Sequence, residues 1–194
     1  MGYSMIFETK IVTLSDGRLI HFDRSGCNND DAGRRQDEFT GKVYTEDEFR
    51  KRIESFKNSA KPYKDSTPHE WELKIYGRMG TMHDYGTHLE RMWKRAEPYD
   101  EFISQRRVIA KRYDGVELLK PENKMLTPEE FDEYSRDLPY EERMTYRVIR
   151  TTLDLSDEQA FVKELESGKS IELYIGEIEQ GYVQGEEQGM SLGM

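Results

Sequence analysis

The stretch FETKIVTLSDGRLIHFDR, residues Phe7 to Arg24, predicts a β-hairpin and with it the fold class. Every second residue of the first arm, from Phe7 to Thr13, is apolar or β-branched, and the residues between them are Glu8, Lys10 and Val12, which is the period of a half-buried strand. Asp16-Gly17 is a strong signal for a tight hairpin turn, and the alternation resumes on the return arm. His21 lies in that return arm as either a surface or a packed residue. The first predicted elements of the fold are therefore two antiparallel strands.

Strands and helices interleave irregularly after this hairpin. Thr45 and Thr127 are each followed three residues later by glutamate, which is the spacing of a capping box at a helix start. Ser156 is expected to cap a further helix, and Gly168 to end it. We expect helices over 45–57, 81–96, 127–138 and 156–167, and further strands over 38–44, 71–77, 106–113, 116–120, 144–155 and 170–178.

This order of elements is too mixed for a doubly wound parallel sheet. It predicts an α+β fold with a mixed, mainly antiparallel sheet that starts with the hairpin, and about four helices packed on it. Residues 1–178 are expected to form a single domain, with a subdivision near 120–127 as the alternative. Residues 179–194 are rich in Gly, Gln and Glu and are expected to be a flexible tail.

The composition indicates a soluble protein. The chain of 194 residues has one cysteine, which suits a reducing compartment and excludes an intrachain disulfide framework. No apolar run approaches the 18 residues of a membrane span, and the first ten residues carry neither a secretory nor a myristoylation signal. We therefore expect a cytoplasmic protein that makes no membrane contact.

The net charge of −10 is unevenly distributed along the chain. Residues 1–125 hold 23 Lys/Arg against 22 Asp/Glu, whereas residues 126–194 hold 6 against 17, a balance of −11. An acidic portion of this kind repels nucleic acid and is attracted to basic surfaces. A solvated acidic surface that keeps the protein soluble would explain the same numbers, and this alternative stays open.

The segment SGCNNDDAGRRQDE, Ser25 to Glu38, is almost wholly polar and is expected to be a long loop. Asn and Asp side chains make turns with the nearby backbone, but long loops in compact domains also often contact partners. The spacing fits neither a calcium-binding nor a phosphate-binding loop. We interpret it as a structural turn or a contact loop, with a metal site as a further alternative, and the candidate contact residues are Asn28, Asn29, Asp30, Asp31, Arg34 and Arg35.

One alternative function is enzymatic. Glu72 and Lys74, on a predicted strand, have the spacing of the acid and lysine in restriction-type nuclease cores, where carboxylates hold Mg²⁺. Asp65 would be the upstream acid, although it is too close for the usual separate strand. Glu-x-Lys also occurs often by chance on an exposed strand face. There is no HExxH motif or Cys/His cluster to predict a zinc site, and the leading hypothesis below requires no metal or cofactor.

A basic stretch from Arg91 to Tyr113 interleaves cations with aromatic residues, a pattern that can follow a nucleic-acid backbone. Three acidic residues interrupt this stretch, and the whole chain is acidic. We therefore expect at most a weak direct contact with RNA or DNA, for which the candidate residues are Arg106, Arg107, Lys111 and Arg112.

Four segments together resemble small accessory proteins carried by phages and mobile elements of Firmicutes. They are LSDGRLIHFDRSGCNNDDAGR (14–34), YTEDEF (44–49), WELKIYG (71–77) and DYGTHLERMWKRA (84–96). The resemblance extends from Phe7 to Gly176 as a whole and does not depend on one diagnostic motif. Proteins of this group include anti-CRISPR inhibitors of type II Cas9 effectors. The resemblance implies an inhibitor that acts in the cytoplasm of a bacterial host, and it transfers no functional residue.

The charge distribution and the resemblance lead to one function hypothesis, a non-enzymatic inhibitor that binds a basic nucleic-acid-handling effector such as Cas9 with its guide RNA. Cas9 holds nucleic acids in basic channels, which carboxylates at phosphate-like spacing can occupy. The alternatives are a metal-dependent nuclease and a non-catalytic interaction module of a mobile element. The predicted contact residues are acids of the last third of the chain: Glu129, Glu130, Asp132, Glu133, Asp137, Glu141, Glu142, Asp157, Glu158, Glu164 and Glu166.

Overall fold

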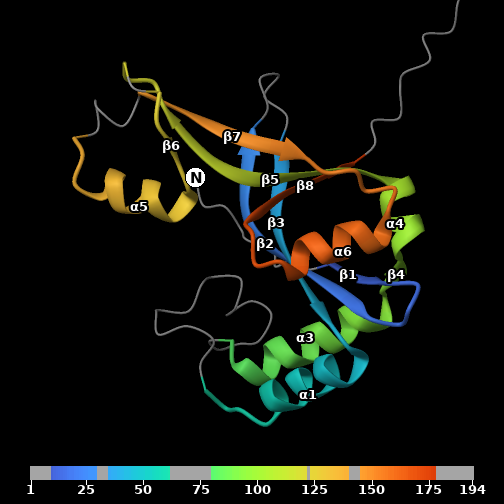
Figure 1. Cartoon of the computed structure of the whole chain (residues 1–194). Helices are drawn as coiled ribbons and strands as arrows, with labels where there is room; N and C mark the ends of the chain where they lie inside the picture. The colour runs from blue at the N-terminus through green and yellow to red at the C-terminus, as the bar shows by residue number, and fades with distance from the viewer. Residues whose placement is uncertain (1–9, 30–34, 62–79, 122, 140–144, 178–194) are drawn as a thin grey trace, which may run out of the picture.

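The computed structural model describes residues 10–29, 35–61, 80–121, 123–139 and 145–177, which form an eight-stranded sheet and five helices (Figure 1). The strands are β1 Lys10–Thr13, β2 Leu19–Asn29, β3 Arg35–Tyr44, β4 Glu97–Pro98, β5 Arg106–Leu118, β6 Met125–Leu126, β7 Tyr146–Thr152 and β8 Ile171–Glu177. The helices are α1 Glu46–Lys57, α3 Met82–Lys94, α4 Tyr99–Gln105, α5 Pro128–Arg136 and α6 Glu158–Glu166.

The strand order is β4-β1-β2-β3-β8-β5-β6, with β7 on the other edge of β5. Among the described strands only the β1–β4 pair is parallel, which confirms the predicted α+β class with a mainly antiparallel sheet.

The predicted first hairpin is confirmed. β1 and β2 pair antiparallel, with Val12 opposite Ile20, and the Gly17 N–H donates to the Leu14 carbonyl at 3.0 Å. Gly17 has a φ of 88°, a left-handed conformation that glycine adopts without a Cβ penalty. The predicted alternation of side chains between the two faces of the sheet holds in both strands, because successive side chains of a strand point to opposite faces.

The expected loop from Ser25 to Glu38 is wrong at both of its ends. β2 continues to Asn29 and β3 begins at Arg35, with Asn28 opposite Gln36 and a register shift between Arg24 and Gly26. Polar side chains do not prevent strand pairing, because the ladder is formed by the backbone. The segment is therefore the far end of a long hairpin, and residues 30–34 lie outside the described part of the chain.

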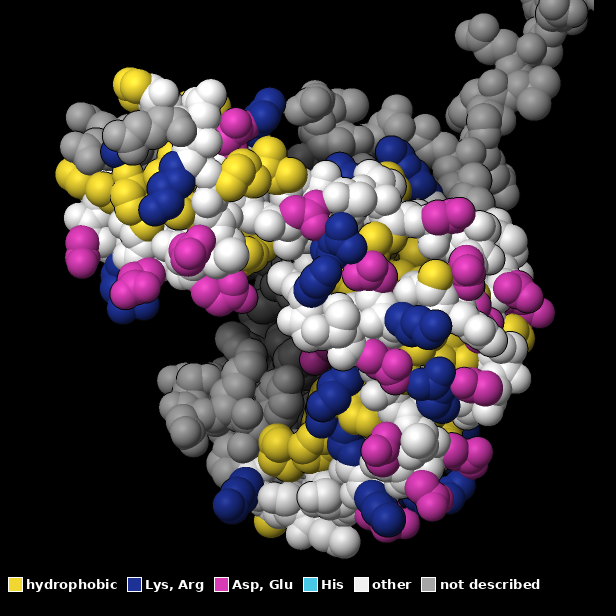
Figure 2. Space-filling model, viewed as in Figure 1, with side chains coloured by type: hydrophobic (Ala, Val, Ile, Leu, Met, Phe, Trp, Pro, Cys, Tyr) yellow, Lys and Arg dark blue, Asp and Glu magenta, His cyan; other side chains and the backbone are white. Residues whose placement is uncertain are grey.

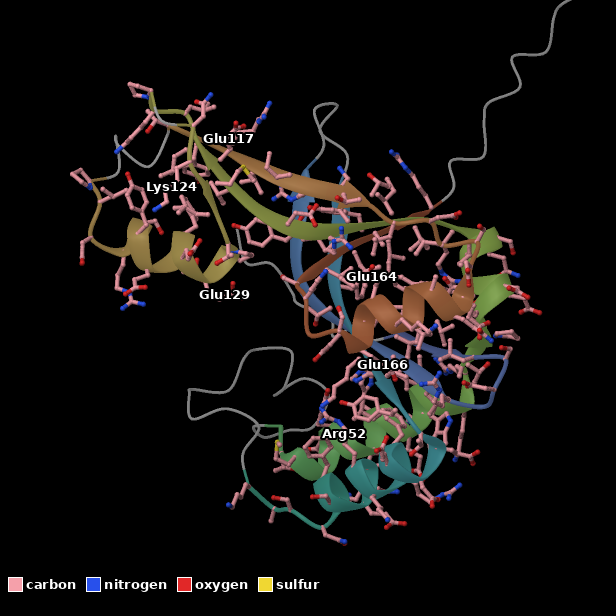
Figure 3. All side chains as sticks on the ribbon, in the orientation of Figure 1. Arg52, Glu117, Lys124, Glu129, Glu164 and Glu166 are labelled. Atoms are coloured by element: carbon pink, nitrogen blue, oxygen red, sulfur yellow. The ribbon has the colours of Figure 1, made fainter. Side chains whose placement is uncertain are left out.

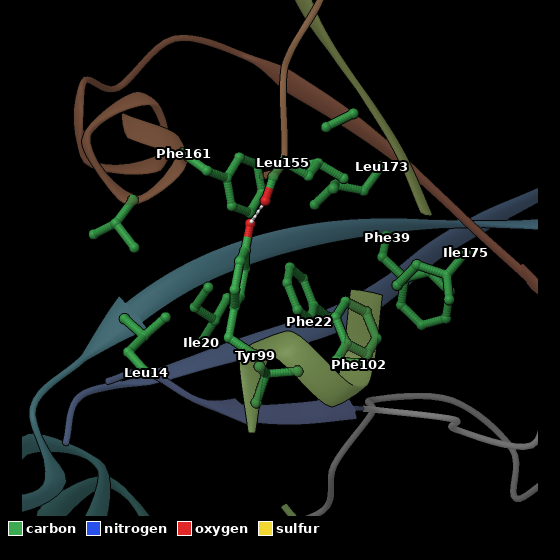
Figure 4. Packing of buried hydrophobic residues seen from close by; sticks show 13 residues of the cluster. Leu14, Ile20, Phe22, Phe39, Tyr99, Phe102, Leu155, Phe161, Leu173 and Ile175 are labelled. Atoms are coloured by element: carbon green, nitrogen blue, oxygen red, sulfur yellow. Dashed lines mark hydrogen bonds between the residues drawn. The ribbon is translucent and has the colours of Figure 1, made fainter. Parts of the chain in front are cut away.

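Helices cover both faces of the first three strands. Ile11 and Leu19 are buried against α1 and α3, together with Phe49, Ile53 and Leu89. On the other face α4 and α6 pack on a second core (Figure 4), whose buried members are Val12, Leu14, Ile20, Phe22, Phe39, Tyr99, Phe102, Ala110, Leu155, Phe161, Val162, Leu173 and Ile175. The period-2 pattern of the hairpin thus places alternate residues in two separate cores.

α4 is a helix that the sequence analysis did not predict. Pro98 is its N-cap, and Tyr99 and Phe102 are its buried residues. Phe102 stacks on Phe22 with ring centroids 5.2 Å apart, and the Tyr99 hydroxyl donates to the Leu155 carbonyl at 2.9 Å (Figure 4). α4 therefore ties the chain before α6 to the sheet. The other four helices confirm the predicted segments, although the N-cap of α6 is Asp157 and not Ser156.

β5 is one long strand, so the expectation of two separate strands over 106–113 and 116–120 is wrong. A register shift between Tyr113 and Gly115 marks a bulge, at which the neighbour of β5 changes from β8 to β6. Gly115 has a φ of 141°, and a Cβ at this position would collide with the Leu126 carbonyl. Glycine is thus required both by the backbone angle and by the close approach of β6.

Beyond the bulge the chain forms a projection that we call the wing. It consists of residues 115–118 of β5, β6, α5 and residues 146–149 of β7, and it extends to one side of the remaining structure in Figure 1. Phe131 of α5 packs on Tyr146 of β7, with ring centroids 4.7 Å apart. The wing has no fully buried helix residue, so it is packed more thinly than the two cores.

Candidate functional site

α5 is positioned by local sequence signals. Thr127 accepts a hydrogen bond from the Glu130 N–H at 3.2 Å, and the Glu130 carboxylate accepts one from the Thr127 N–H at 2.9 Å. Pro128 occupies the first helical position, where its fixed φ and missing N–H cost nothing. The predicted capping box is therefore present, and it engages the carboxylate of Glu130 in the structure of the helix.

Four other predicted contact residues on and after α5 have exposed, unpaired carboxylates. Their side-chain oxygens make no hydrogen bond or ion pair with any described residue, and the residues are Glu129, Asp132, Glu133 and Asp137. Three of them lie three or four residues apart, so their side chains share one helix face with Cβ atoms roughly 5–6 Å apart. Figure 2 shows acidic side chains gathered on the surface that α5 forms, and Glu129 is labelled there in Figure 3.

The predicted contact residues on α6 are engaged within the fold instead. Glu158 accepts hydrogen bonds from the Ser15 N–H at 2.9 Å and the Ser15 hydroxyl at 2.7 Å. Glu166 pairs with Arg18 at 2.8 Å, so two acids of α6 hold the β1–β2 turn. The Asp157 carboxylate accepts from the Ala160 N–H as the N-cap. These carboxylates already have partners, in contrast to those of α5.

Glu164 of α6 joins a further network at the β5 bulge. Arg112 pairs with Asp114 at 2.7 Å and with Glu164 at 3.1 Å. Thr151 of β7 also donates to Asp114. The hydrogen bonds from Thr151 and Arg112 lower the pKa of the Asp114 carboxyl, because they favour its charged form. Glu164 and Glu166, labelled in Figure 3, therefore both connect α6 to the sheet.

The candidate RNA-contact residues of β5 divide in the same way. Arg106 pairs with Glu97 and lies 5.5 Å from the Phe102 ring centroid, and Arg112 is held in the network just described. Arg107 is exposed and Lys111 is half-buried, and neither has a partner among the described residues. Two of the four predicted cations thus serve the fold, and two separated cations remain available.

Several predicted site residues lie outside the described part of the chain. They are Asp30, Asp31, Arg34, Asp65, Glu72, Lys74, Glu141 and Glu142. Asn28, Asn29 and Arg35 lie in β2 and β3, at the far end of the long hairpin. Within the described residues, no group of three or more His, Cys, Asp or Glu side chains could hold a metal ion. The nuclease alternative gains no support from these residues.

One buried ionisable residue was not distinguished by the sequence analysis. His21 is 4% exposed, its ring and the Phe49 ring form an edge contact with centroids 5.8 Å apart, and its Nε2 has no hydrogen-bond partner among the described residues. Burial, together with the charges of Arg52 and His88, lowers its pKa to about 4. The sequence signal for its burial was its spacing, because His21 lies two residues after Leu19 in the same strand and therefore shares the face of this buried residue. His21 is therefore a neutral packed residue, one of the two readings left open.

Across the described residues, no helix has the length and apolar character needed to cross a membrane. No protein-family model, no curated protein and no solved structure matches the chain.

Proposed function

We propose that this chain is a non-enzymatic inhibitor from a mobile genetic element, which binds a basic nucleic-acid-handling effector through the outer face of α5. CRISPR Cas9 is the effector to test first. The proposal combines the resemblance of the sequence, the −11 balance of residues 126–194 and the unpaired carboxylates of α5. The bound protein would block the use of guide RNA or DNA by the effector.

The observation that carries the proposal is the row formed by Glu129, Asp132 and Glu133. These carboxylates are exposed, and the opposite side of the helix is held on the wing by Phe131. Binding therefore requires no internal ion pair to break, which would be the cost at Glu164 or Glu166. A fixed row of carboxylates on a helix can replace phosphates in a basic channel and speeds association through long-range attraction.

The wing also suits insertion into a channel. It projects from the body in Figure 1. Two exposed apolar side chains, Leu119 (54% exposed) and Met125 (53% exposed), flank the connection between β5 and β6, and we call this pair the tip of the wing. Exposed apolar side chains at the end of a projection add contact area once water is excluded. We therefore place the contact surface on the outer face of α5 and on this tip.

The experiment mixes the purified protein with Cas9 before and after guide loading. It measures complex formation, cleavage of a DNA target and integrity of the guide RNA in the same samples. The proposal predicts a stable complex that weakens as salt is raised, blocked cleavage and an intact guide. Absence of a complex at low salt with both forms of Cas9 would overturn the choice of effector, and degraded guide would indicate the nuclease instead.

A pair of matched variants tests the surface itself. Glu129→Gln with Asp132→Asn and Glu133→Gln removes three charges from α5 and should weaken the complex at least about tenfold. The control removes three exposed acids elsewhere, Glu54→Gln with Asp100→Asn and Glu101→Gln, and keeps the same net charge as the first variant. Equal weakening by both sets would mean that total charge, and not the face of α5, controls binding.

A further inference from the structure

We propose that the free edge of β7 is a self-association site, at which two copies of this chain pair antiparallel around Ile149 and join their sheets. β7 pairs only with β5 among the described strands, so its other edge is the margin of the sheet. An unpaired strand edge presents backbone donors and acceptors and is a template for another strand. This inference does not depend on the proposed function, since α5 and the β7 edge are different surfaces.

The hydrogen bonds to β5 establish which backbone groups point outward. Leu119 donates to the Thr145 carbonyl at 3.1 Å, and Leu153 donates to the Ala110 carbonyl at 2.9 Å. Inward bonding alternates along an antiparallel strand, and the bulge lies on β5, so the alternation on β7 is unbroken. The N–H and C=O groups that point away from β5 are therefore those of Tyr146, Val148, Arg150 and Thr152.

The usual protections of a strand edge are lacking in β7. The strand contains no proline, glycine or bulge, and four of its seven residues are β-branched. Its two cations are neutralised within their own sheet. Arg150 binds Glu172 through two hydrogen bonds of 2.8 and 3.1 Å, and Arg147 pairs with Glu117. The charges that would repel a second strand are thus compensated.

The sequence of β7 is complementary to itself, so a second copy of this chain can pair with its free edge. In a pair centred on Ile149, Val148 lies opposite Arg150 and Arg147 lies opposite Thr151, so no like charges face each other. All four outward residues find a hydrogen-bonding counterpart, because Tyr146 then faces Thr152. A centre at Arg150 would oppose two arginines, and a centre at Val148 would place Thr152 beyond the end of the other copy's β7. Only the Ile149 centre satisfies both the backbone groups and the charges.

The register can be tested by disulfide trapping. At the two-fold centre Ile149 forms a non-hydrogen-bonded pair with its copy, with Cα atoms about 4.5 Å apart, which is within disulfide range. Ile149→Cys in a Cys27→Ser background should therefore give a covalent dimer under mild oxidation. Thr151→Cys in the same background is the matched control, because its copy would lie about 13 Å away along the strand. We expect at least about tenfold more dimer at position 149.

A second pair of variants tests the backbone contact in solution. The unmodified chain should sediment with twice the 22.9 kDa of one copy at high concentration. Thr152→Pro removes an outward N–H at an exposed position and should raise the dimer dissociation constant about tenfold or more without lowering the thermal midpoint. Thr152→Ala keeps the N–H and should leave the dimer intact.

Any of three results would overturn the inference. The first is a monomer in sedimentation at about 1 mM, a concentration at which even a weak dimer forms. The second is equal trapping at positions 149 and 151, which would mean random collision and not a defined register. A dimer that survives Thr152→Pro would likewise locate self-association on another surface.

Discussion

α5 and α6 are two acidic helices of nine residues each, and they use their charges in opposite ways. α6 buries Phe161 and Val162 in the larger core, and its acids bind Ser15, Arg18 and Arg112. α5 buries no residue completely and leaves four nearby acids exposed and unpaired within the described structure. The difference teaches that the acidity of a segment does not identify a contact surface, since the tertiary position decides which carboxylates are available.

The largest expected effect on stability comes from removing the main packing residue of each helix, and it should be much larger for α6 than for α5. Phe161→Ala removes a side chain that is 2% exposed and packs near Tyr99, so we expect it to lower the free energy of unfolding by about 3–5 kcal/mol. Phe131→Ala on α5 removes a half-buried ring and should cost less than half as much. Urea unfolding of both variants measures this, and equal losses would contradict the contrast between an integrated and a peripheral helix.

Lowering the pH should destabilise the protein through protonation of His21 in β2, and not through the acidic residues of α5 or α6. The pKa of His21 is about 4 in the folded chain against about 6.5 when unfolded, so the unfolded state binds more protons between these values. The free energy of unfolding should therefore fall as pH is lowered from about 6.5 to 4, by up to about 3 kcal/mol. His21→Leu should flatten this part of the profile. An unchanged profile in His21→Leu would show that carboxylates carry the acid sensitivity.

A substitution at the bulge should affect the wing selectively. Gly115→Ala introduces a Cβ against the Leu126 carbonyl and strains a φ of 141°, so it should cost roughly 1–3 kcal/mol. Hydrogen exchange should show faster opening of β6 and α5, while α6 keeps its protection. Uniform loss of protection across both helices would mean that the wing and the body are one cooperative unit.

The smallest expected effect on the free energy of unfolding comes from neutralising one carboxylate on each helix. Glu158→Gln weakens two hydrogen bonds to Ser15 and should cost about 1 kcal/mol, whereas Glu129→Gln should change the free energy of unfolding by less than about 0.5 kcal/mol. Thermal melts of the two variants in parallel are sufficient. A loss at Glu129 as large as that at Glu158 would reveal an interaction of α5 that the structure does not contain.

Local signals in the sequence predicted the elements well. The Asp16-Gly17 turn and the capping boxes at Thr45 and Thr127 depend on residues within a few positions of one another, and all are present. α4 was not predicted because its seven residues are too few for a helical period to emerge between Pro98 and β5. Polar composition also concealed the strand ends from Ser25 to Glu38.

The division of the acidic residues could not be predicted in the same way. Glu158 reaches Ser15 across 143 positions and Glu166 reaches Arg18 across 148, so these contacts exist only once the sheet has assembled. The sequence placed both helices in one acidic set, with Glu133 and Glu164 as equivalent members. Availability of a carboxylate is a tertiary property, so the charge count marks an acidic region without distinguishing which of its carboxylates are unpaired.

The most direct test of the account is the response of individual side-chain carboxylates to the partner. Carbon-detected NMR of the free protein, then of the protein with sub-stoichiometric guide-loaded Cas9, follows the Glu and Asp carboxyl signals of both helices. The account predicts that the signals of Glu129, Asp132 and Glu133 lose intensity first, while Glu164 and Glu166 stay unchanged. Loss at Glu164 and Glu166 with no change on α5 would contradict it.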